Sequence, residues 1–122
     1  MSVIVVDGAN VVGARPDGWW KDRAGAARRL HEQLMTAEVE GDIVLVLEGE
    51  AKGGVRPGRD GHVTVVHAPT DGDSEIVRQA HKAADAGHAV TVVTADRLLA
   101  ARVAKAGPTV GPSWLLDRLG ES

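Results

Sequence analysis

The feature that most constrains the fold is the apolar run at residues 3–6, which consists of β-branched residues and ends directly in Asp7. An uninterrupted apolar run of this kind is typical of a strand buried on both faces of a parallel sheet. Gly8 follows where the chain has to turn. Ligands of open α/β sheets bind outside the carboxyl ends of the strands, so Asp7 is well placed for chemistry. Aspartate is also common in turns for local reasons, and this position alone leaves both interpretations open.

The pattern of an apolar strand followed by a helix recurs along the chain. Strands are predicted at residues 3–7, 43–48, 63–67 and 90–94, with a two-residue strand at 109–110. Helices are predicted at about 23–40, 75–86, 97–106 and 112–119. The five glycines of residues 49–61 predict a mobile basic loop. The alternation predicts one domain over residues 1–122, with a doubly wound, mostly parallel α/β sheet of four to five strands and helices on both faces.

The composition excludes several classes of protein. With 43% apolar and 25% charged residues, the chain is typical of a globular domain rather than a disordered one. It has no Cys, which excludes disulfides and thiolate metal sites. A net charge of −3 is unlike that of a polybasic nucleic-acid binder, although clustered carboxylates can hold cations that reverse the local field. Without an early apolar segment of membrane-spanning length, we expect a cytoplasmic protein with no membrane association.

Carboxylates recur where the predicted strands end. Asp7, Glu48 and Asp96 follow three of them, and Asp71 and Asp73 lie between the third strand and its helix. In a parallel sheet all five meet at one edge, where like charges repel one another. A hard cation such as Mg²⁺ or Mn²⁺ relieves that repulsion, binds oxygen ligands and activates water for attack at phosphate. The local alternative is that Asp73 and Asp96, which each lie at the start of a helix, only cap it or suit its dipole.

Three segments of the chain resemble those of the NYN domain, a branch of the PIN-like ribonuclease superfamily. They are VVDGANV at residues 5–11, GDSEIV at 72–77 and VTADR at 93–97, and they occur in the family's order. Together they frame nearly the whole chain. The resemblance implies a doubly wound α/β sheet and a metal-dependent endoribonuclease, that is, a hydrolase of RNA phosphodiester bonds that uses Mg²⁺ or Mn²⁺.

The resemblance also implies site residues. By that match Asp7, Asp73 and Asp96 are the catalytic, metal-binding carboxylates, and Asn10 is their polar partner in the first loop. Glu48 stands where the family usually has Asp, and its side chain is longer by one methylene group. We include Glu48 among the predicted metal ligands, with Asp71 as the alternative residue that completes the site.

RNA, single-stranded or structured, is the expected partner, and a homodimer is left open. The residues predicted to contact phosphate are Arg97, Arg15 and Lys21, with Lys52, Arg56 and Arg59 as further candidates. Solvated surface is an equally good interpretation of any one of them. Trp19 and Trp20 either stack on an unpaired base or form an apolar plug over the first helix. The lack of Phe and Tyr favours the plug, because the core needs bulky side chains.

Two other functions are compatible with this fold. A non-catalytic RNA- or protein-binding module would keep the fold without turnover, but the retention of Asp7, Asp73 and Asp96 favours the enzyme. A phosphoacceptor regulatory domain also gathers acids at strand ends. It requires a lysine in a late loop, whereas Lys105 falls within a predicted helix.

Overall fold

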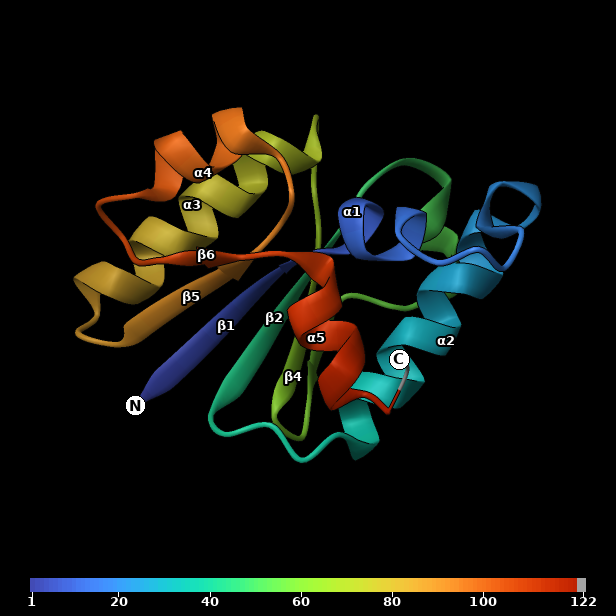
Figure 1. The fold of residues 1–122 in the computed structure, drawn as a ribbon, viewed down its shortest axis with the longest axis horizontal. Helices are drawn as coiled ribbons and strands as arrows, with labels where there is room; N and C mark the ends of the chain where they lie inside the picture. Colours follow the sequence, from blue (N-terminus) through green and yellow to red (C-terminus); the bar gives the residue numbers. More distant parts are fainter. Residues whose placement is uncertain (121–122) are drawn as a thin grey trace.

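A six-stranded sheet forms the centre of the computed structural model, which describes residues 1–120 (Figure 1). In spatial order the strands are β3 (Gly58–Asp60), β4 (Val63–His67), β2 (Asp42–Leu47), β1 (Ser2–Asp7), β5 (Ala89–Val93) and β6 (Thr109–Val110). All neighbouring pairs are parallel except β3 and β4, which are antiparallel. The predicted doubly wound, mostly parallel architecture is confirmed, with one strand more than expected.

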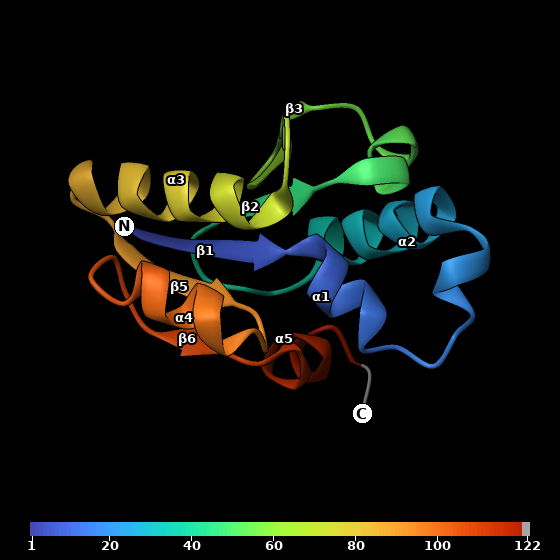
Figure 2. The same cartoon turned by 90° about the horizontal axis from the view of Figure 1, so that it is seen from above.

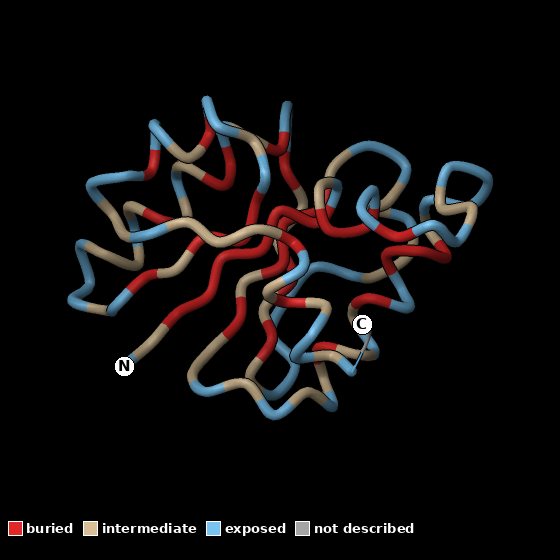
Figure 3. The backbone as a smooth tube through the Cα atoms, in the orientation of Figure 1, coloured by how far each residue is buried: buried red, intermediate tan, exposed pale blue. Residues whose placement is uncertain are grey.

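Helices cover both faces of the sheet because successive strand residues point to opposite sides. In β1, Ile4 and Val6 belong to the core cluster of one face, and Val3 and Val5 belong to that of the other. Figure 3 shows the buried residues concentrated along the central strands. The first face is covered by α1 (Gly8–Gly13), α2 (Arg23–Thr36) and α5 (Pro112–Arg118), and the second by α3 (Gly72–Asp85) and α4 (Arg97–Val103) (Figure 2).

The helix boundaries differ from the predicted ones at several ends. Residues 8–13, expected as a turn and loop, form the short helix α1. The predicted end of the next helix at residue 40 is wrong, since Ala37 already has an extended backbone and Val39 packs against the core. Asp22 caps α2 through a 2.8 Å hydrogen bond from the Gly25 N–H, as the sequence predicts. No helix within residues 1–120 is long and apolar enough to span a bilayer.

The glycine-rich segment 49–61 is not the loose loop that the sequence predicts. It contains the 3₁₀ helix η2 (Gly49–Gly54) and the edge strand β3. Lys52 donates a hydrogen bond to the carbonyl of Ala68 at 3.0 Å, and the His67 imidazole bonds the carbonyl of Val55 at 2.7 Å. These contacts tie the segment to the sheet. A 3₁₀ turn has neither the helical nor the strand period, so the apolar pattern could not reveal it.

Candidate active site

The carboxyl ends of β1, β2 and β5 meet at one edge of the sheet. The parallel register pairs Asp7 of β1 with Val46 of β2, and Val6 with Val93 of β5. The residues that follow these strands therefore lie beside Asp7: Glu48 on one side and Thr94 on the other. This is the convergence that the strand-end carboxylates predict.

Asp7 is the buried member of this group, with a fractional exposure of 6%. One oxygen, Oδ1, accepts a hydrogen bond from the Asn10 N–H at 3.3 Å and so caps α1, while Oδ2 accepts one from the Thr94 hydroxyl at 2.9 Å. Burial raises the pKa of Asp7 above its ordinary value of 3.8, and these two hydrogen bonds lower it only in part. The negative charges of Asp73 and Glu48 raise the pKa further. Asp7 is thus a rigidly held carboxylate in an acidic environment.

Thr94 and Asn10 position the loop after β5. The Thr94 hydroxyl also accepts a hydrogen bond from the Asp96 N–H at 3.2 Å, and Asn10 Oδ1 accepts one from the Ala95 N–H at 2.8 Å. The Asn10 side chain therefore holds the backbone next to Asp96. Sequence reasoning assigned no role to Thr94; the available signal was a hydroxyl at the last position of the predicted strand 90–94.

Asp96 is the N-cap of α4, where Oδ1 accepts hydrogen bonds from the N–H groups of Leu98 (2.9 Å) and Leu99 (3.1 Å). The capping interpretation of Asp96 is thus confirmed. Capping does not exclude a second role, because both of these hydrogen bonds use the same oxygen.

Asp73 does not cap α3. The cap is Asp71, which accepts hydrogen bonds from the Ser74 N–H at 2.7 Å and from its hydroxyl at 3.1 Å, and these bonds lower the Asp71 pKa. Asp73 lies in the first turn, half-buried, and its carboxylate accepts no hydrogen bond from any side chain or backbone group of residues 1–120. Burial raises the pKa of Asp73, and the charges of Asp96 and Glu48 add to the increase.

Glu48 reaches from the end of β2 to the first turn of α3. Its Oε2 accepts a hydrogen bond from the Gly72 N–H at 3.0 Å. A Cβ on Gly72 would lie 2.9 Å from Oε1, so glycine allows this close approach. The extra methylene group of glutamate lets the carboxylate reach the Gly72 N–H of α3, whereas the shorter side chain of an aspartate would end further from it.

The acids are close enough to affect one another's ionisation but do not form a closed ligand cage. No three carboxylate or imidazole side chains of residues 1–120 come together in a way that could hold a bare metal ion. The acidic side chains at this edge offer only carboxylate oxygens as ligands for a metal ion. The arrangement fits a hard cation that keeps several of its water molecules, as Mg²⁺ does, better than a fully dehydrated ion.

Comparison with known proteins tests the fold. No protein-family model matches the chain, and no curated protein sequence does. A solved structure that matches is the crystal structure of Rae1 (YacP) from Bacillus subtilis, with a TM-score of 0.78 over 98% of this chain and 76% of that one. The chain has the fold of Rae1. The two sequences are 16% identical, so the likeness supports the predicted PIN-like architecture and nothing finer.

The three residues predicted to contact phosphate differ in their exposure and in their neighbours. Arg97 is exposed and adjoins Asp96, and Lys21 is exposed in the 3₁₀ helix η1 (Trp19–Lys21). Arg15, by contrast, is buried, and its guanidinium donates a hydrogen bond to the Gln33 side chain of α2. Because its guanidinium is buried against α2, Arg15 contributes to packing, and we do not propose it as a contact to RNA.

Proposed function

We propose that the chain is a metal-dependent endoribonuclease that hydrolyses RNA phosphodiester bonds at the carboxyl edge of its sheet. The observation that carries this proposal is the gathering of Asp7, Glu48, Asp73 and Asp96, with Arg102 offsetting only part of the increase in the Asp73 pKa. None of the four makes an ion pair within residues 1–120. Hydrogen bonds stabilise Asp7, Glu48 and Asp96 in the fold, but gathering the four carboxylates costs stability. Burial and mutual repulsion raise the pKa values of Asp7 and Asp73.

The residues at this edge divide the work of hydrolysis among them. A bound Mg²⁺ or Mn²⁺ would be held by Asp7, Asp73 and Asp96, in part through its waters, and would supply a nucleophilic water and neutralise phosphate charge. Asp7 is held in place by Thr94 and by the backbone of α1. The Asp73 carboxylate accepts no hydrogen bond within residues 1–120, so both of its oxygens are available to the cation or to its waters. We assign to Arg97, which is exposed at the start of α4, the binding of a phosphate of the RNA.

A non-catalytic RNA- or protein-binding module is the second candidate. It is favoured by one observation, the lack of a closed set of metal ligands within residues 1–120. The two functions differ in turnover and in the need for a divalent cation.

Asp96→Asn separates these functions. Asparagine caps a helix about as well as aspartate, so the hydrogen bonds to α4 and the melting temperature should be kept or improved. The ionised oxygen that a hard cation prefers is lost, and we expect metal-dependent cleavage of single-stranded RNA to fall by about a hundredfold or more. Cleavage is measured with Mg²⁺, with Mn²⁺ and with chelator.

The matched control is Asp85→Asn, which removes an exposed acid at the far end of α3. It should cleave as the wild type does. If the wild type cleaves no RNA in the presence of either metal, or if the Asp96→Asn protein keeps its activity, the nuclease proposal is wrong and the binding module takes its place.

A further inference from the structure

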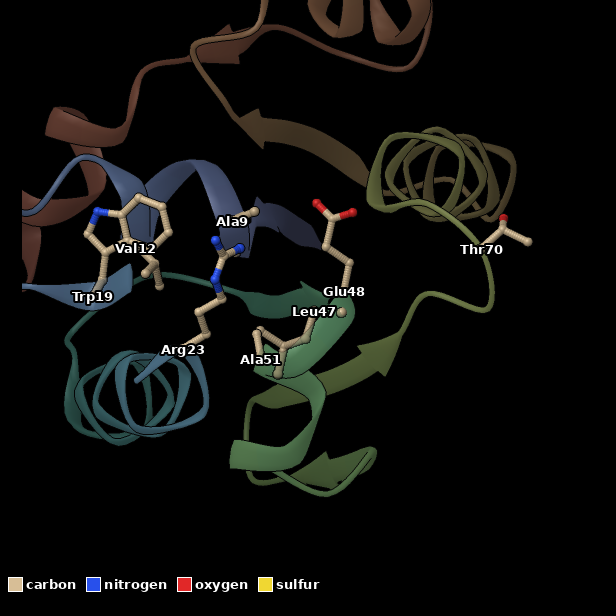
Figure 4. A pocket seen from close by; sticks show the side chains of 10 residues that line it. Ala9, Val12, Trp19, Arg23, Leu47, Glu48, Ala51 and Thr70 are labelled. Carbon is tan, nitrogen blue, oxygen red and sulfur yellow. The ribbon is translucent and has the colours of Figure 1, made fainter. Parts of the chain in front are cut away.

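A cleft of about 450 Å³ opens directly beside the acidic edge (Figure 4). Its volume lies within the range of about 300–1,000 Å³ that is usual for small-molecule sites. It begins at Glu48 and runs between α1, η2 and the start of α2. The residues that line it are Gly8, Ala9, Val12, Trp19, Arg23, Leu47, Glu48, Gly49, Ala51 and Thr70.

One end of the cleft carries an aromatic ring and a cation. The guanidinium carbon of Arg23 lies 5.2 Å from the centroid of the Trp19 ring. Arg23 makes no ion pair within residues 1–120, so its charge is not neutralised by a carboxylate of the described chain. Figure 4 shows Arg23 and Glu48 entering the cleft from different sides.

Trp19 and Trp20 have different surroundings although they are adjacent. Trp19 packs partly against the core cluster of α1 and α2 and exposes the rest of its ring to the cleft. Trp20 meets the Trp19 ring edge-on, does not line the cleft and is 57% exposed. The predicted plug is therefore only one part of what Trp19 does, because its ring also lines the cleft, with the Arg23 guanidinium over it.

We propose that this cleft holds one unpaired nucleotide of the RNA substrate, adjacent to the phosphodiester bond at the acidic edge. The base lies among Trp19, Val12 and the other apolar lining residues, and Arg23 binds the neighbouring phosphate. This inference rests on the proposed nuclease function and adds to it a subsite that selects unpaired RNA. A base within a duplex is stacked and paired and would have to be unpaired and flipped out, at a cost in free energy, before it could enter the cleft.

A nucleotide fits this lining better than a purely apolar ligand does. The walls combine flat apolar surface with a cation at one end and an acceptor carboxylate, Glu48, at the other. A nucleotide offers a ring to stack, a phosphate for Arg23 and ring or amino N–H groups for Glu48. The cleft is also continuous with the acidic edge through Glu48, so a chain of nucleotides can occupy both at once.

Binding, rather than cleavage, tests this subsite. The probe is a fluorescent single-stranded RNA octamer, whose anisotropy is titrated in Mg²⁺ and again in chelator, with its integrity checked on a gel. Trp19→Ala should weaken binding about 5- to 150-fold, the range that base–aromatic stacking gives. Trp20→Ala is the control and should bind as the wild type does. An octamer of abasic nucleotides should bind weakly and show no response to Trp19→Ala.

Ala51→Leu is a second variant that tests the subsite if the Trp19→Ala protein fails to fold. Ala51 is partly exposed on the cleft wall, so a larger side chain fills the cleft without removing any packing. This variant should weaken octamer binding with no loss of melting temperature. Weakened binding by both cleft variants supports the subsite even if the wild type cleaves nothing, which separates this result from a failure of the nuclease proposal.

Three results would overturn the subsite. The first is wild-type affinity in the Ala51→Leu protein, even when RNA cleavage is normal. The second is an abasic octamer that binds as tightly as the natural one. The third is guanosine monophosphate alone binding as tightly as the octamer, which would make the cleft a site for free nucleotides.

Discussion

Replacing Thr94 by valine is expected to destabilise the protein at neutral pH. Valine has nearly the same shape as threonine, so the change removes a hydroxyl and little else. That hydroxyl is 2.9 Å from Asp7 Oδ2 and 3.2 Å from the Asp96 nitrogen, and Thr94 is 4% exposed. Water cannot readily replace the donor to Asp7, and a buried carboxylate oxygen loses its partner.

The size of the effect follows from these contacts. A hydrogen bond to a charged group contributes about 1.5–3 kcal/mol, and the methyl group that replaces the hydroxyl returns about 0.8 kcal/mol through burial. The net loss is about 1–2 kcal/mol in the free energy of unfolding. For a domain of this size that corresponds to a drop of about 3–10 °C in melting temperature.

The pH dependence identifies the cause. The pKa of Asp7 in the folded protein is already above its ordinary value of 3.8, and Thr94 is one of the groups that lower it. Valine at position 94 raises the folded pKa further and leaves that of the unfolded chain unchanged. The extra destabilisation should therefore be small below pH 3.8, grow as the pH rises and be complete above the folded pKa of the variant.

Urea unfolding of three proteins across this pH range tests the reasoning. Thr94→Ser keeps the hydroxyl and should recover much of the stability. Thr91→Val makes the same exchange within β5, three residues before Thr94. The Thr91 side chain makes no hydrogen bond within residues 1–120, so this variant should be nearly neutral. If Thr94→Val is as stable as Thr91→Val at neutral pH, the hydrogen bond to Asp7 does not hold this edge together.

Four further substitutions probe packing and charge. Gly8→Ala should lose about 1–3 kcal/mol in urea unfolding, because its Cβ would lie 2.6 Å from a carbonyl oxygen of β2. Gly13→Ala, whose nearest atom is 3.8 Å away, should be neutral or gain up to about 1 kcal/mol. Asp7→Asn should gain stability relative to the wild type as the pH rises from 3.8 through the folded pKa of Asp7, because a raised pKa means that ionisation costs stability. Below pH 3.8 it should melt no higher than the wild type, because an amide accepts only one of the two hydrogen bonds that Asp7 accepts. Burial raises the pKa of Glu75, but hydrogen bonds from Arg78 lower it below 4.5 overall, so Glu75→Gln should melt lower at neutral pH and the gap should close in acid.

The amino-acid sequence by itself determined the five parallel strands, their alternation with helices and the order of the acids. Apolar β-branched runs specify buried strands through local preference and burial, which act within a few residues. The position of Asp7 at the end of such a run places it at the sheet edge in any parallel arrangement. The same local reasoning predicted the Asp22 cap and offered a cap as one role of Asp96, since capping joins residues only three positions apart.

Only the tertiary structure decided how the acids are held and what lies beside them. Thr94 and Asp7 are 87 positions apart, and Asn10 and Ala95 are 85 apart, so no local pattern links them. The burial of Arg15 and the cleft at Trp19 likewise depend on helices packing against each other. Such contacts arise from the relative positions of whole elements, which the packing of the core sets and which the periodicity of one segment does not encode.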